Sequence, residues 1–174
     1  MKAQLKRKLK NFWCYRPEPA SNNQADLFAG PKFQDLNELE LEIIRRVQPF
    51  TMTSIERIVS LIQAVQYIVR NSVSGDFVEC GVWKGGSMMA VALTLINEKA
   101  GDRQLYLFDT FDGMPEPSEQ DAAASDGRSA KELLAAESKD SSSYIWAYCP
   151  EDIVRQNMQS VGYDQNKIDR KSVV

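Results

Sequence analysis

Three glycines and one acidic residue lie close together in one short stretch of the chain, at spacings that could bind a ligand. Residues 78–87 read Val-Glu-Cys-Gly-Val-Trp-Lys-Gly-Gly-Ser, so that Glu79 and Gly81 end an apolar run and Ser87 follows a glycine pair. Glycines at the carboxyl end of a strand let the backbone approach a ligand closely, and the N–H groups at the start of the next helix favour a negative group. The stretch therefore predicts a binding site of the kind that doubly wound sheets form at a strand–turn–helix junction.

The glycine spacing argues against the common phosphate-binding loops. A dinucleotide fingerprint requires G-x-G-x-x-G, whereas Gly81 is followed by Val82 and Trp83. A P-loop requires its lysine after the glycines, whereas Lys84 precedes them. Both interpretations are weakened, although another nucleotide-binding α/β domain remains an alternative.

A second carboxylate, Asp109, follows the apolar run Leu-Tyr-Leu-Phe at 105–108. A carboxylate at this place can accept hydrogen bonds from a ribose diol, and Glu79 suits a ligand that carries positive charge. S-adenosylmethionine has both features, with Ser87 and the helix start facing its carboxylate. The alternative is that the glycines only shape a tight turn, Glu79 pairs with a nearby lysine, and Asp109 caps a loop.

The elements that must position these residues form a βαβ unit. The spacing predicts a strand over residues 76–80, a buried helix that begins at Gly85-Gly86 and stops near Gly101, and a strand over 105–108. Such a unit implies two parallel strands with a right-handed crossover. The fold class is therefore α/β.

Two amphipathic helices are predicted before this unit and a loop-rich insert after it. The helices begin at Asp35, with Glu38 in a capping box, and after Thr53, with Glu56 in a second box. Residues 112–143 are rich in Pro, Gly, Ser and acidic residues, and a loop of this length beside a strand end is usually functional. A helix opened by Pro150 and a third strand within 167–174 complete the pattern. Residues 1–34 are predicted to be a basic arm and linker.

Composition excludes several classes of function. The 174 residues carry a net charge of −3 and no histidine, which disfavours nucleic-acid binding and rules out any imidazole base or ligand from this chain. Three cysteines without a C-x-x-C motif favour free thiols in a reducing, cytoplasmic environment. No apolar run is long enough to cross a membrane, so no membrane partner is expected. No metal site is expected within this chain.

The chain resembles the TylF-type macrocin O-methyltransferase family between about Phe33 and Ile168. The resemblance rests on residues 75–87 and on 107–115, Leu-Phe-Asp-Thr-Phe-Asp-Gly-Met-Pro, with support from the start of the second helix and from Glu151-x-x-Val-Arg-x-Asn157. It implies a partial class I methyltransferase, a Rossmann-like parallel sheet with N-terminal helices. The implied activity is methyl transfer from S-adenosylmethionine to a small-molecule acceptor, a hydroxyl of a sugar or similar group in a natural product.

The resemblance also implies roles for individual residues. Glu79, Gly81 and Ser87 would line the methionine end of the cofactor, and Asp109 would hold the ribose. The insert 112–143 would be a lid over the acceptor. The remaining implied cofactor contacts are Thr51, Met52 and Thr53 on the N-terminal side and Thr110 and Phe111 beside the adenosine.

The chain departs from the family pattern at its C-terminal end. The family's magnesium ligands lie on later strands, so magnesium is expected only for a full-length member, and the catalytic base is unknown. The residues from Asp169 onward fit the family poorly, which favours a truncated product. A partial sheet would leave the glycine-turn strand unpaired on one side, so the chain alone is predicted to be inactive and either unstable or paired with a second copy. A non-catalytic fragment remains the alternative.

Overall fold

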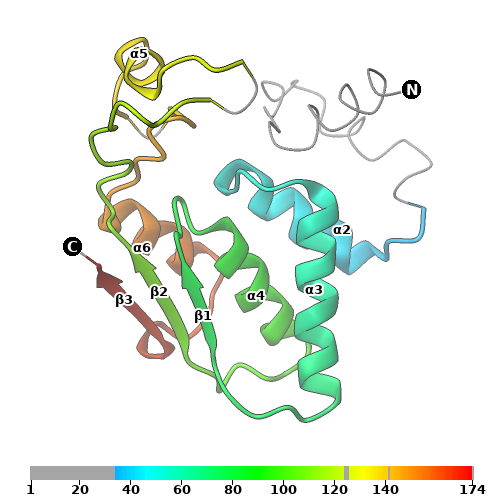
Figure 1. Cartoon of the computed structure of the whole chain (residues 1–174). Helices are drawn as coiled ribbons and strands as arrows, with labels where there is room; N and C mark the ends of the chain where they lie inside the picture. Colours follow the sequence, from blue (N-terminus) through cyan, green and yellow to red (C-terminus); the bar gives the residue numbers. More distant parts are fainter. Residues whose placement is uncertain (1–33, 124–125, 141, 174) are drawn as a thin grey trace.

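A computed structural model describes residues 34–173 except 124–125 and 141. All but one residue of the predicted arm and linker, 1–34, therefore lie outside the described residues. The described part is an α/β fold with a parallel three-stranded sheet in the order β1-β2-β3 (Figure 1). The strands are β1 (Phe77–Cys80), β2 (Leu105–Asp109) and β3 (Ile168–Ser172).

The sheet confirms the predicted βαβ unit and extends it by one strand. α4 (Gly86–Asn97) links β1 to β2, and α6 (Glu151–Ser160) precedes β3. Phe77 is in register with Leu105, which in turn is in register with Ile168. The third strand predicted near the end of the chain is therefore present.

The two N-terminal helices form, but each begins later than predicted. α2 (Glu38–Val47) is capped by Asn37, which exchanges hydrogen bonds with Glu40, whereas the sequence predicted a box between Asp35 and Glu38. The prediction was wrong because two overlapping residue pairs have the spacing of a capping box, and the helix is capped by the second pair. A 3-10 turn, η3 (Gln48–Phe50), follows. α3 (Ile55–Arg70) is preceded by Ser54 rather than Thr53, and the Ser54 side chain makes no capping bond.

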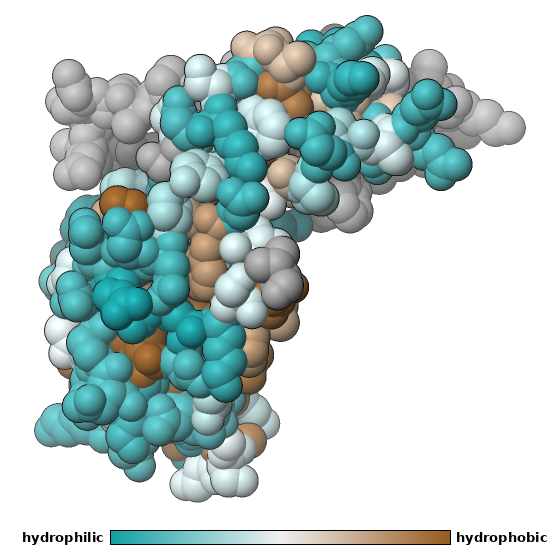
Figure 2. Space-filling view, turned by 90° about the vertical axis from the view of Figure 1, so that its left-hand side faces the viewer, coloured by the Kyte–Doolittle hydropathy of each residue, from teal (hydrophilic) through white to brown (hydrophobic). Residues whose placement is uncertain are grey.

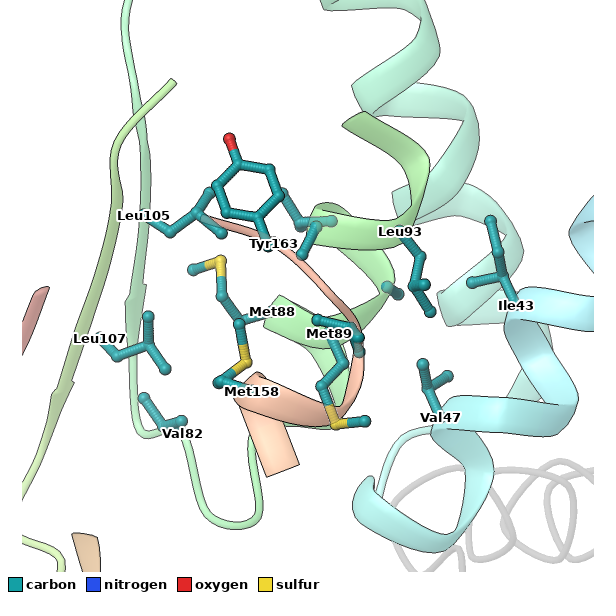
Figure 3. Packing of buried hydrophobic residues seen from close by; sticks show 14 of the residues in the cluster. Ile43, Val47, Val82, Met88, Met89, Leu93, Leu105, Leu107, Met158 and Tyr163 are labelled. Carbon is teal, nitrogen blue, oxygen red and sulfur yellow. The ribbon is translucent and has the colours of Figure 1, made fainter. Parts of the chain in front are cut away.

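The hydrophobic core lies on one side of the sheet. Figure 3 shows Leu105 and Leu107 pointing from β2 toward Met88 of α4 and Met158 of α6. Ile43 and Val47 of α2 contribute to the same cluster, which continues across α4 toward α2 and α3. α4 is buried on nearly all sides, as its apolar sequence predicted.

The segment between β2 and α6 carries little regular structure. Its one short helix in the described residues is α5 (Ala130–Ala135). A 3-10 turn, η4 (Gln165–Lys167), follows α6 and precedes β3. In Figure 2 the upper part of the molecule, where Figure 1 places α5, projects beyond the body and leaves a hollow beneath it. None of the described helices combines the length and apolar character that a membrane crossing requires.

Candidate functional site

The glycine turn after β1 is built by backbone conformations that few residues adopt. Gly81 has φ +85° and Gly85 has φ +89°, and between them Trp83 has φ +46°. The left-handed region favours glycine, so Trp83 is held there by its surroundings. A Cβ on Gly81 would meet nothing within 4 Å, which leaves open space beside the end of β1.

Asp109 fastens this turn to the end of β2. Its Oδ2 accepts the backbone N–H groups of Val82 at 2.5 Å and Trp83 at 3.0 Å, and its Oδ1 accepts that of Phe111 at 2.9 Å. The Thr110 hydroxyl lies 3.4 Å from the same Oδ1 and 3.2 Å from the Gly113 carbonyl. An ionised carboxylate has about four acceptor positions, so at most one remains for a ligand when Thr110 donates to Gly113.

Glu79 is the buried acid of the site. Its Oε2 is buried and has no hydrogen-bond partner within the described part of the chain. The pKa of Glu79 is raised to about 7, chiefly by burial and to a smaller extent by the nearby Asp109 charge, while hydrogen bonds from the Ser87 hydroxyl and the Met88 N–H oppose the rise. A buried carboxylate oxygen without a donor favours a ligand that brings a positive charge or an N–H group.

The N-terminal side of the site approaches the start of α4 closely. A Cβ on Gly86 would lie 2.5 Å from the Phe50 carbonyl oxygen and 2.7 Å from Thr51 Cβ, so only glycine fits there. The Thr51 hydroxyl accepts the Thr53 N–H at 3.1 Å. The glycine pair therefore has a packing role that the sequence did not reveal, because the contact comes from a segment about 35 residues earlier.

Asn157 is a further residue of the site whose role the sequence did not reveal. Its Nδ2 donates to the Lys84 carbonyl at 2.9 Å and so joins α6 to the glycine turn. The sequence pattern Glu151-x-x-Val-Arg-x-Asn157 includes this residue but does not indicate its hydrogen-bond partner, because Lys84 lies 73 positions away. The bond restrains the backbone just before Gly85.

Tyr144, the residue that directly follows the insert, contacts the same turn through its aromatic ring. The Trp83 ring lies 5.3 Å from the Tyr144 ring, and Lys84 Nζ lies 4.5 Å from the Trp83 centroid. Trp83 is 8% exposed, and its Nε1 has no partner within the described residues. The C-terminal end of the insert is thus held beside the glycine turn.

The predicted cofactor residues divide into two groups. Glu79, Ser87 and Asp109 come together at the carboxyl ends of β1 and β2, with Gly81 beside them. Thr51 contacts the start of α4, and Thr110 and Phe111 surround the Asp109 carboxylate. Met52 and Thr53 lie half-buried in the adjoining segment that leads to α3, and within the described residues no hydrogen bond joins their side chains to Glu79 or Asp109.

Cys149 and the metal-binding types of side chain in the described residues add no further chemistry to the site. Burial raises the pKa of the Cys149 thiol to about 11, so this thiol is inert at neutral pH. Among the described residues, no three side chains of the metal-binding types come together. The donor set for magnesium is thus not found in this part of the chain.

The fold and the site together define a class of protein, an α/β domain with a glycine turn and two carboxylates at adjacent strand ends. The solved structure of the O-methyltransferase NovP has the same fold, with a TM-score of 0.53 and 26% identity. The match covers 70% of this chain and 46% of that one.

The chain belongs to the macrocin O-methyltransferase (TylF) family, whose model matches residues 27–169. Demethyldecarbamoylnovobiocin O-methyltransferase of Streptomyces niveus is 36% identical over 80 residues, which are 46% of this chain and 30% of that protein. Mycinamicin III 3''-O-methyltransferase of Micromonospora griseorubida is 32% identical over 71 residues, or 41% of this chain and 28% of that protein. The aligned region therefore spans less than a third of either curated relative.

Proposed function

We propose that this chain binds S-adenosylmethionine as part of an O-methyltransferase that acts on a hydroxyl group of a sugar or similar natural product. Family membership supports methyl transfer, and its relatives carry names of natural-product O-methyltransferases. The single observation that carries the cofactor proposal is the buried, unpartnered Oε2 of Glu79 beside the open space at Gly81.

The cofactor's ammonium group would meet the Glu79 carboxylate. A cation at this place supplies the opposite charge that the buried acid lacks, and it stabilises the ionised form. The Ser87 hydroxyl and the Met88 N–H orient the carboxylate. Gly81 leaves room for the cofactor chain to approach the backbone.

Asp109 would contact the ribose with the one acceptor position that its backbone bonds leave. The carboxylate would therefore not accept hydrogen bonds from both hydroxyls of the ribose diol, because the N–H groups of Val82, Trp83 and Phe111 already occupy three of its acceptor positions. Thr110 and Phe111 would lie beside the adenosine, and Thr51, Met52 and Thr53 on the opposite side of the turn.

The bound cofactor would supply an activated methyl group, and this chain would align it. Fixing the donor relative to an acceptor hydroxyl contributes to methyl transfer by proximity and orientation. The insert 112–143, attached through Tyr144 to Trp83, would cover the acceptor and exclude water. Residues 35–174 would then form the N-terminal portion of the methyltransferase domain, working in the cytoplasm, without a nucleic-acid or membrane partner.

Calorimetric titration of the chain with S-adenosylhomocysteine tests the proposal, with NAD and ATP as competitors of other classes. We expect S-adenosylhomocysteine to bind and the other two ligands to give no heat. Glu79→Gln should weaken binding roughly tenfold, because a neutral amide offers no charge to the ammonium group. Glu116→Gln, in the exposed part of the insert, is the matched control.

The outcomes separate the competing functions. Binding of NAD or ATP in preference to S-adenosylhomocysteine would assign the chain to a different nucleotide-binding class. Binding of S-adenosylhomocysteine without turnover would fit a non-catalytic fragment that keeps its cofactor affinity. No binding of any of the three ligands would overturn the proposal.

A further inference from the structure

Two buried polar atoms at the glycine turn have no hydrogen-bond partner within the described residues, and they are of opposite type. Glu79 Oε2 is an acceptor and Trp83 Nε1 is a donor, and the two residues lie four positions apart in the sequence. Buried polar atoms are nearly always paired in folded proteins, because an unpaired one has lost its bonds to water without replacement. The two atoms together therefore indicate a ligand that carries both a hydrogen-bond donor and an acceptor.

Trp83 has two N–H donors, and only one of them has an acceptor in the described part of the chain. Its backbone N–H donates to Asp109 Oδ2 at 3.0 Å, whereas its indole Nε1 has no acceptor although Trp83 is 8% exposed. Trp146 shows the ordinary arrangement, because its indole Nε1 lies 3.1 Å from the carbonyl oxygens of both Leu134 and Glu137. The unpaired indole N–H thus distinguishes Trp83 from Trp146.

The backbone of Trp83 adopts a conformation that disfavours a large side chain. Its φ of +46° lies in the left-handed region, where the Cβ of an ordinary residue is crowded by the backbone. Glycine occupies the positions with positive φ on either side, at 81 and 85. Residues strained in this way concentrate at ligand sites, where the surrounding structure holds them. The conformation of Trp83 is therefore consistent with an indole that is held in place for a ligand.

The surroundings of the two unpaired atoms favour opposite charges. The Asp109 charge lies near Glu79, so a cation is favoured on that side of the turn. Lys84 Nζ lies 4.5 Å from the centroid of the Trp83 ring, which places a positive charge beside the indole. The first turn of α4, whose dipole is positive at this end, begins at Gly86. An anion is therefore favoured near the indole and a cation near Glu79.

An α-amino-acid group carries both charges, because its ammonium and its carboxylate are bound to the same carbon atom. The methionine end of S-adenosylmethionine is such a group. The Ser87 hydroxyl already donates to Glu79, so its single proton is not available for the carboxylate of the cofactor.

We propose that the indole N–H of Trp83 donates a hydrogen bond to the carboxylate of the cofactor, while Glu79 accepts from its ammonium group. Trp83 is then a cofactor-binding residue in addition to those that the family resemblance indicated. The site recognises the amino-acid group as a zwitterion, with one unpaired atom for each charge. This inference rests on the proposed cofactor site.

NMR of the chain with isotope-labelled tryptophan tests the proposal, because each indole N–H gives its own resonance. Trp83→Phe and Trp146→Phe assign the two signals. S-adenosylhomocysteine should move the Trp83 indole proton downfield, since a hydrogen bond to a carboxylate deshields it, and should leave the Trp146 proton in place. Decarboxylated S-adenosylhomocysteine, which keeps the ammonium group, should move neither proton.

A cycle of binding measurements separates the hydrogen bond from any effect of Trp83 on the shape of the turn. Trp83→Phe should weaken the binding of S-adenosylhomocysteine roughly tenfold or more, because it keeps an aromatic ring but removes the N–H donor to a charged group. The same variant should bind the decarboxylated ligand as the parent chain does. Trp146→Phe is the matched control and should bind both ligands with parental affinity.

The outcomes distinguish this proposal from the cofactor site on which it rests. Failure of the parent chain to bind S-adenosylhomocysteine would overturn both. Binding with an unmoved Trp83 resonance and parental affinity in Trp83→Phe would overturn the indole contact alone. Equal weakening of both ligands by Trp83→Phe would limit Trp83 to shaping the turn and would likewise overturn the contact.

Discussion

The carboxylate of Asp109 accepts the backbone N–H of Val82 at 2.5 Å, although the two residues are 27 positions apart. With the second bond to the Trp83 N–H, it fixes the glycine turn of β1 to the end of β2. Hydrogen bonds to charged groups contribute about 1.5–3 kcal/mol each, so this residue supports the shape of the site as well as any ligand contact.

Asp109→Ala should therefore lower the free energy of unfolding by about 2–3 kcal/mol, because it leaves the N–H groups of Val82 and Trp83 without their acceptor. Urea unfolding measures the change. Asp112→Ala is the control, since Asp112 is largely exposed and pairs with Lys139 at 3.3 Å, and it should shift stability by less than about 0.5 kcal/mol. Equal midpoints for Asp109→Ala and the parent chain would contradict the structural role of Asp109.

Glu79 should make the chain less stable as pH rises. Its pKa is about 7 in the folded chain against 4.5 ordinarily, so the folded state holds a proton that the unfolded state has lost between these values. The free energy of unfolding should fall across this window, by roughly 3 kcal/mol at most, and then level off above pH 7. Thermal unfolding at pH 5 and pH 8 measures the effect. Glu79→Gln should remove most of the slope, and an unchanged slope would contradict the assignment.

Gly86→Ala should destabilise the chain by about 1–3 kcal/mol, since the new Cβ would lie 2.5 Å from the Phe50 carbonyl oxygen. Gly127→Ala separates this clash from backbone strain. Gly127 has φ +76° with no atom within 4 Å of the added Cβ, so only about 1–2 kcal/mol of strain is expected, in an exposed loop. Calorimetric melting compares the two variants. Gly86→Ala should also shift η3, which a change in fluorescence from a label near Phe50 would report.

Asn157→Ala should loosen the glycine turn, because it removes the 2.9 Å bond to the Lys84 carbonyl. We expect a loss of about 1 kcal/mol in stability and weaker binding of S-adenosylhomocysteine by about fivefold. Gln156→Ala, an exposed neighbour on α6, should change neither quantity. Asn157→Ala with reduced stability but parental affinity would limit Asn157 to a packing role.

Tyr144→Ala should release the insert from Trp83, since the rings lie 5.3 Å apart and aromatic pairs contribute about 0.5–1.5 kcal/mol. Trypsin cleavage after Arg128, Lys131 or Lys139 should then be several-fold faster, because local opening exposes the backbone to the protease. Tyr67→Ala, on α3, should leave cleavage in the insert unchanged. A parental digestion rate for Tyr144→Ala would show that other contacts hold the insert.

The regular elements could be predicted from the sequence because their signals are local. The apolar run before Gly81, the buried pattern of α4 and the glycine at its start all lie within a few residues of the structure they specify. The helix starts were less certain for a physical reason. Asp35 and Asn37 each have a glutamate three positions later, and only the packing of α2 decides which one caps it.

The role of Asp109 could not be read from its place after β2. A carboxylate at this position could either bind a ribose or hold the glycine turn in place. Which role it has depends on whether the N–H groups of Val82 and Trp83 point toward it. The turn that presents them has left-handed φ values at Gly81 and Trp83, and the sequence carries no signal for the second, because Trp83 is not a glycine. The Asn157–Lys84 bond and the Gly86–Phe50 contact escaped prediction because they join distant segments.

The strands follow one another in space in the same order as along the chain, and this has a consequence for biosynthesis. Phe77 pairs with Leu105, and Leu105 pairs with Ile168. Each described strand therefore pairs with the strand that precedes or follows it in the sequence. The N-terminal part of a protein folds first as it leaves the ribosome. The described sheet can therefore assemble stepwise during translation, each new strand adding to a template already in place.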